Sequence, residues 1–193
     1  MKNEMDVIFL LDRSGSMSGI EEDTIGGYNS YITSNKNKNY KVTTVLFDDK
    51  YEMITNREDI KNIKKLTNKK YFVRGCTALL DAIGKTIKYI ESKNSKKVLF
   101  IITTDGLENA SSEYNKSQIS EMIKGHKDWE FMYIGADIDS YSEGEKIGIS
   151  KKNISNYKKD RKGVGKLFKA ISAASEMMYE ECELNEDWKK NLE

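Results

Sequence analysis

The feature that most constrains the fold is an alternation of short apolar runs with longer amphipathic segments. Residues 7–11, 42–47, 98–103 and 131–134 are short runs rich in β-branched and aromatic side chains. Such runs are typical of strands that are buried on both faces. The segments between them repeat apolar residues at helical spacing. Because parallel neighbours need long crossover connections, the alternation predicts a parallel sheet with helices on both faces.

Three segments show the clearest helical pattern. Their apolar faces consist of Ile25, Tyr28 and Ile32, of Leu80, Ile83, Ile87 and Ile90, and of Val164, Leu167, Phe168, Ile171, Ala174, Ser175 and Met178. Residues 51–54 follow the second strand after only "DDK", so they predict an antiparallel edge strand. Ser140, with Glu143 three residues later, predicts the capped start of a short helix. We therefore predict one Rossmann-like, three-layer α/β/α domain over residues 1–193.

The charge balance and the cysteines limit the partners and the compartment. The chain has 32 Lys and Arg against 31 Asp and Glu, so no strong field attracts nucleic acid or an anionic membrane. The first apolar run is too short for a signal sequence or a membrane span. Cys76 and Cys182 lie far apart, which fits a reduced compartment better than a disulfide framework. We predict a cytoplasmic monomer that binds neither nucleic acid nor membrane.

Oxygen-bearing side chains follow the strands at one edge of the predicted sheet. The stretch "LLDRSGSMSG" leads from the first strand into Asp12, Ser14 and Ser16. A later strand runs into "TDG" at Asp105. Two strands therefore deliver a carboxylate to the edge where open parallel sheets bind ligands. "RGCTALLDAIG" adds Thr77 just before a predicted helix, although Thr77 taken alone is better explained as a helix cap.

The chemistry of these side chains indicates a metal. All offer oxygen, and none offers sulfur or imidazole, which suits a hard divalent cation. Hydroxyl ligands add no negative charge, so the bound ion would stay electrophilic. With protein ligands on one side only, it would keep an open position for a carboxylate from a partner. We predict one divalent cation, with Mg²⁺ preferred and Mn²⁺ or Ca²⁺ as alternatives.

At this point the sequence resembles the von Willebrand factor type A (VWA) domains and their metal-ion-dependent adhesion site. That site has D-x-S-x-S after the first strand, a threonine in a later loop and an aspartate after the fourth strand, and here "DRSGS", "GCT" and "TTDG" match in order. The resemblance covers roughly residues 5–180, and "GADIDSYSEGEKIGI" is similar to a segment of small bacterial or phage members. The metal residues it implies are Asp12, Ser14, Ser16, Thr77 and Asp105.

The resemblance also implies a function. It points to a protein-interaction module in which an Asp or Glu of a protein partner completes the coordination of the cation. In related domains the serines and the threonine commonly bind the ion directly, and the aspartates bind it directly or through water. Which ligands are direct in this chain stays open.

An enzyme is the main alternative class, and several motifs weigh against it. "GSMSG" has Met17 where a nucleophile elbow needs serine. The single histidine, His126, precedes a predicted strand at the end opposite the site, which disfavours a Ser-His-Asp triad. "GVGK" at residues 163–166 has Asp160 and Leu167 where a phosphate loop needs Gly and Ser or Thr. We therefore predict that the protein is not an enzyme.

Two alternatives stay open. A metal-dependent phosphate-ester hydrolase would need a general base near the ion. Asp48, Asp49 and Glu108 are available, and we interpret them as residues that shape loops or the rim. A metal-independent interaction domain would use the same sheet, with the five metal residues vestigial.

Overall fold

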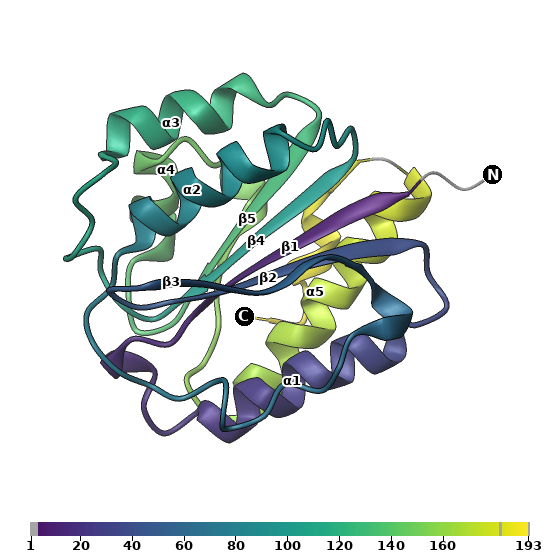
Figure 1. Ribbon diagram of the computed structural model, residues 1–193, viewed down its shortest axis with the longest axis horizontal. Helices are drawn as coiled ribbons and strands as arrows, with labels where there is room; N and C mark the ends of the chain where they lie inside the picture. Colours follow the sequence, from purple (N-terminus) through teal and green to yellow (C-terminus); the bar gives the residue numbers. More distant parts are fainter. Residues whose placement is uncertain (1–3, 182, 193) are drawn as a thin grey trace.

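The strands form one six-stranded sheet with helices on both faces (Figure 1). The computed structural model describes residues 4–181 and 183–192, so Cys182 lies outside the described residues. The strands are β1 (Met5–Asp12), β2 (Tyr40–Phe47), β3 (Tyr51–Asp59), β4 (Val98–Thr104), β5 (Trp129–Gly135) and β6 (Ile154–Asn156). The helices are α1 (Glu21–Ser34), α2 (Leu79–Glu91), α3 (Lys116–Gly125), α4 (Ser140–Lys146) and α5 (Arg161–Glu181). Short 3₁₀ turns are η1 (Gly15–Met17), η2 (Ile60–Asn62), η3 (Lys151–Asn153) and η4 (Glu186–Lys189).

The sheet topology confirms the predicted fold class. The strand order is β3-β2-β1-β4-β5-β6, and every neighbouring pair is parallel except β2 and β3. The predicted antiparallel edge strand is therefore present, and it is longer than expected. Helices α1 and α5 cover one face, and α2, α3 and α4 cover the other (Figure 1). Among the described residues, no helix combines the length and the hydrophobicity needed to cross a bilayer.

The sequence analysis missed two elements and misplaced one cap. Strand β6 has three residues, and α3 buries only Ile119 and Ile123, so neither gives a strong periodic signal. The predicted Ser140 cap is wrong by one residue. Asp139 is the N-cap of α4, and its side chain accepts a hydrogen bond from the Ser142 N–H. Aspartate and serine are similarly good caps, so the residue types alone did not distinguish Asp139 from Ser140.

Strand β1 lies at the centre of the sheet and separates two apolar cores. All eight of its residues are buried. Because successive side chains in a strand point to opposite faces, Phe9 and Leu11 join the core under α1 and α5, while Ile8 and Leu10 join the core under α2 and α3. Burying each of these side chains contributes about 1.5–3 kcal/mol. The carboxyl end of β1 is therefore held in a fixed position.

Helix α1 approaches α5 closely at Gly27. A Cβ atom on Gly27 would lie 2.2 Å from a ring carbon of Phe168, which is 4% exposed. Its neighbour Gly26 has open space at the same position. We expect Gly27→Ala to destabilise the protein by about 1–3 kcal/mol through overpacking. We expect Gly26→Ala to stabilise it by up to about 1 kcal/mol through helix propensity. Urea unfolding of both variants measures this, and equal shifts would contradict the close packing.

The chain reverses its direction of travel across the sheet at β1. From β1 it moves outward through β2 to β3, and it then returns to β4 on the other side of β1. β1 and β4 are parallel neighbours, with Leu11 opposite Thr103 in the register. Open α/β sheets bind ligands at such a reversal, outside the carboxyl ends of the strands.

Candidate metal centre

The two candidate aspartates meet at this reversal. β1 ends at Asp12, and Asp105 directly follows the last residue of β4. Both are buried, with exposed fractions of 0% for Asp12 and 6% for Asp105. The two strands are parallel neighbours with Leu11 opposite Thr103, so the aspartates that follow them lie at the same edge of the sheet, as the sequence predicted.

The two candidate serines lie on the turn that follows β1. Asp12 Oδ1 accepts a hydrogen bond of 2.7 Å from the Ser14 N–H, which folds the chain back on the carboxylate. The turn η1 follows at once, and Met17 at its end is buried and anchors it. As a result, Ser14 Oγ and Ser16 Oγ lie 3.0 Å apart.

Thr77 reaches the same place from the loop before α2. Its N–H donates to Asn109 Oδ1 at 2.9 Å, and its carbonyl accepts from the N–H groups of Asn109 and Ala110. The loop that carries Thr77 is therefore bound to the loop that carries Asp105. The cap position of α2 is Ala78, and the first-turn N–H groups of Leu80 and Asp81 donate to the side chains of Glu108 and Ser111. The alternative that Thr77 is the helix cap is wrong.

The three hydroxyls converge on one point beside Gly106. A Cβ atom on Gly106 would lie 2.7 Å from Thr77 Oγ1, 3.0 Å from Ser16 Oγ and 3.5 Å from Ser14 Oγ. A side chain at this position would fill the space that the hydroxyls surround, so the glycine keeps that space free. Three neutral oxygens around a small space, beside two buried carboxylates, fit a hard divalent cation.

Asp105 carries an unsatisfied oxygen. Its Oδ1 is buried and has no hydrogen-bond partner within the described part of the chain. Its Oδ2 lies 2.7 Å from Lys159 Nζ. Leaving a buried acceptor without a partner costs about 1–3 kcal/mol, and more for a charged group. The unsatisfied oxygen is what a site for a cation or its bound water would show.

The environment of Asp12 penalises its charge. Burial raises the pKa of Asp12 to about 6, although hydrogen bonds from Thr104 and Ser14 oppose the rise, and the nearby charge of Asp105 adds to it. Thr104 Oγ1 donates to Asp12 Oδ2 at 2.5 Å. A positive ion beside Asp12 would relieve this penalty.

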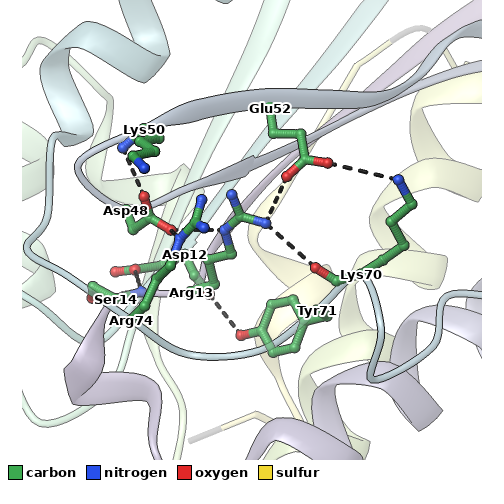
Figure 2. Close-up of polar contacts among 9 residues, drawn as sticks. All are labelled: Asp12, Arg13, Ser14, Asp48, Lys50, Glu52, Lys70, Tyr71 and Arg74. Carbon is green, nitrogen blue, oxygen red and sulfur yellow. Dashed lines mark hydrogen bonds and ion pairs between the residues drawn. The ribbon is translucent and has the colours of Figure 1, made fainter.

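A buried arginine fixes the turn between Asp12 and Ser14 (Figure 2). Arg13 is fully buried, its Nε donates to Asp48 Oδ2 at 2.8 Å, and its Nη1 donates to Glu52 Oε2 at 2.8 Å. Nη1 also contacts the Lys70 carbonyl at 3.3 Å. The side chain therefore ties the turn after β1 to the β2–β3 hairpin and to the segment around residue 70.

The main chain of this turn is held as well. The Tyr71 hydroxyl donates a hydrogen bond of 2.6 Å to the carbonyl of Asp12, as Figure 2 shows. The Arg13 N–H donates to the Phe47 carbonyl at 2.8 Å, and the Arg74 N–H donates to the Arg13 carbonyl at 2.9 Å. These main-chain hydrogen bonds fix the backbone between Asp12 and Ser14, which carries two of the candidate metal residues.

Sequence reasoning missed the residues that support the site. Thr104 lies inside "TTDG" and was open to detection, because a parallel register places it beside the end of β1. Arg13 lies inside "DRSGS", but nothing in a sequence indicates that a charged side chain will be buried. Tyr71 and Lys159 come from distant segments, and no local pattern marks them.

Two of the three acidic residues considered as a general base, Glu108 and Asp48, hold loops in place, as predicted. Glu108 accepts hydrogen bonds from the N–H groups of Leu80, Ala110 and Ser111, which holds its loop against the start of α2. Asp48 accepts hydrogen bonds from two arginines. Burial alone would raise the pKa of Asp48, but the hydrogen bonds from Arg74, the Lys50 N–H and Arg13 outweigh it and lower the pKa.

Among the described residues, no group of three or more His, Cys, Asp or Glu side chains could hold a metal.

Comparison with known proteins identifies the fold. No protein-family model matches the sequence, and no curated protein matches it. Solved structures do match. Proximal thread matrix protein 1 from the mussel byssus is 15% identical with a TM-score of 0.66, over 88% of this chain and 45% of that one. A von Willebrand factor type A structure from Catenulispora acidiphila is 14% identical with a TM-score of 0.68, over 90% of this chain and 43% of that one.

A third match carries a metal. Manganese-loaded TRAP protein of Plasmodium vivax is 18% identical with a TM-score of 0.59, over 86% of this chain and 74% of that one. The mussel protein is also known with a zinc-occupied MIDAS motif, the metal-ion-dependent adhesion site. This chain spans less than half the length of the mussel and Catenulispora chains. The chain has the Rossmann-like α/β fold of a VWA domain.

Proposed function

We propose that this protein is a protein-interaction module that depends on a divalent cation. The residues that hold the cation are Asp12, Ser14, Ser16, Thr77 and Asp105. The observation that carries the proposal is the convergence of three hydroxyls around the space beside Gly106, next to two buried carboxylates. Mg²⁺ is the first choice, because it favours oxygen ligands and keeps positions open for further groups.

The donor set explains how such a site would select its partner. When bound, the ion supplies an electrophilic centre to which an Asp or Glu of a protein partner can bind. The hydroxyls of Ser14, Ser16 and Thr77 are neutral, so they add no negative charge to that of the two aspartates and the ion stays electrophilic. Thr104 and the Ser14 N–H hold the carboxylate of Asp12 in place by hydrogen bonds. The metals in the mussel and Plasmodium proteins of the same fold support this proposal.

The contacts of the other titratable residues favour binding over catalysis. Both oxygens of Asp48 and both oxygens of Glu108 already accept hydrogen bonds. His126 is stacked on Trp129 with ring centroids 3.9 Å apart, and it pairs with Glu91 near the amino end of β5. A hydrolase would need a general base that can approach a bound phosphate. We therefore propose a module without enzymatic activity.

Thermal unfolding in chelator, and then with millimolar Mg²⁺, Mn²⁺ or Ca²⁺, tests the metal site. At about a hundred times its dissociation constant, a bound ion should stabilise the wild type by roughly 2.7 kcal/mol. We expect no such gain in Thr77→Ala, which removes a ligand. We also expect none in Gly106→Ala, which keeps all five oxygen ligands and places a methyl group among the hydroxyls.

Gly26→Ala is the matched control, because it adds the same methyl group at an open position of α1. It should keep the full response to metal. A response in Gly106→Ala equal to that of the wild type would show that the ion binds elsewhere. No response of the wild type to any ion would contradict metal binding and favour a metal-independent interaction domain.

The location and the assembly state are also proposals. We propose that the protein acts in the cytoplasm as a monomer and that its partners are proteins. Light scattering coupled to size-exclusion chromatography measures the assembly state directly, and a dimer mass would contradict it.

A further inference from the structure

Lys159 places a positive charge on one of the candidate metal residues. Its Nζ lies 2.7 Å from Asp105 Oδ2, and the Asp105 side chain is 1% exposed while that of Lys159 is 22% exposed. The same ammonium donates a hydrogen bond to the main-chain oxygen of Ser16. Lys159 therefore joins two segments that carry candidate metal residues, although it comes from the connection between β6 and α5.

We propose that Lys159 is an internal cation that holds Asp105 in the metal-free protein and that a divalent ion displaces. This inference rests on the metal site proposed above. Asp12 and Asp105 together offer two negative charges, of which Lys159 balances one. A divalent ion balances both, but it is repelled by an ammonium that stays on the same carboxylate. Lys159 thus sets the metal concentration at which the site fills.

The geometry allows the side chain to leave while its backbone stays. Before Lys159, the Tyr157 N–H donates to the Gly135 carbonyl at 2.8 Å, which continues the pairing of β6 with β5. After it, Asp160 Oδ1 accepts from the Gly163 N–H at 2.7 Å and caps the start of α5. The anchors on both sides fix the main chain. The flexible four-carbon stem of lysine can still swing toward solvent, so displacement needs only a change of rotamer.

Calorimetric titration with Mn²⁺ at fixed pH and salt tests the competition. We expect Lys159→Met to bind Mn²⁺ about twofold to fivefold more tightly than the wild type, since a partly exposed ion pair has an effect of this order. Lys159→Arg keeps the charge and should bind about as the wild type does. Lys158→Met is the matched control, because that side chain is 86% exposed and its Nζ lies 3.9 Å from Asp160 Oδ2. It should leave Mn²⁺ affinity unchanged.

Thermal unfolding gives a second readout. In chelator, Lys159→Met leaves the buried Asp105 carboxylate without a counter-charge, so its midpoint should fall below that of the wild type. Saturating Mn²⁺ should then raise the midpoint by more than it does in the wild type. Equal or weaker Mn²⁺ binding by Lys159→Met would overturn the competition and leave the proposed metal site intact. No Mn²⁺ binding by any of the folded proteins would overturn both.

Discussion

Replacing Arg13 with methionine is expected to destabilise the protein by about 1.5–3 kcal/mol, the usual contribution of buried hydrogen bonds to a charged group. Both the Arg13 and the Asp48 side chains have an exposed fraction of 0%. Methionine has a similar length but no donors, so it loses the contacts with Asp48, Glu52 and the Lys70 carbonyl together. Urea unfolding of the metal-free protein measures the loss.

Arg74→Met is the matched control for this effect. Its Nε binds the same oxygen of Asp48 at 2.7 Å, but its side chain is 36% exposed and its guanidinium has water as an alternative partner. We expect only a small fraction of the Arg13 effect. Equal losses of unfolding free energy in the two variants would show that the burial of Arg13 adds nothing to its stabilising effect. Because Arg13 also fixes the turn between Asp12 and Ser14, we expect Arg13→Met to weaken metal-dependent stabilisation as well.

Replacing Asp12 with asparagine is expected to have the opposite effect in the absence of metal. The amide has no charge to bury, and it keeps an oxygen that can accept from the Ser14 N–H. The shift of the Asp12 pKa from 3.8 to about 6 corresponds to a penalty on the order of 2–3 kcal/mol at pH 7. Asp12→Asn should recover most of this in chelator, and it should lose the response to metal. A site selected for binding commonly costs stability in this way.

The sign of the pH dependence follows from the same shift. The folded protein holds the Asp12 proton more tightly than the unfolded chain, because the folded pKa is about 6 and the ordinary value is 3.8. As the pH rises from about 4 through about 6, the unfolded chain gains this charge first, and metal-free stability falls. The gain of Asp12→Asn over the wild type should therefore be small near pH 4 and complete above pH 7.

Unfolding free energies at several pH values in chelator, taken as differences between variant and wild type, isolate this group. Asp105→Asn provides a second comparison, because it is expected to change the metal-free stability in the opposite direction. That variant removes the ion pair with Lys159 and should lower the metal-free stability. A constant difference between Asp12→Asn and the wild type across this pH range would contradict the burial penalty on Asp12.

The fold could be predicted because its signals are local and repeated. Strand β1 lies in the middle of the sheet with all of its residues buried, and this gives a continuous apolar run that the sequence shows directly. Helix α2 buries a regular face, including Ile83, Ile87 and Ile90. The elements that were missed, β6 and α3, have too few buried residues to produce a period. The cap of α4 was misplaced because two adjacent residues suit the same role.

The candidate site could be predicted in part, and for a similar reason. Asp12 and Asp105 follow strands that the sequence identifies, and parallel strands bring their carboxyl ends to one edge. The spacing of Ser14, Ser16 and Thr77 in the sequence does not show where their hydroxyls point. The structure shows that the three hydroxyls converge on one point. No sequence pattern indicated that Gly106 borders this space and keeps it free of a side chain.

The sequence by itself determined most of the strands and helices, the parallel sheet with its antiparallel edge, and the oxygen character of the candidate site. These follow from periodicity and side-chain chemistry, which are local properties. Only the tertiary structure decided that Arg13 is buried between two loops, that Asp12 has a raised pKa, and that Lys159 pairs with Asp105. Burial and pairing depend on which distant segments meet, because desolvation and Coulomb interaction act through space and not along the chain.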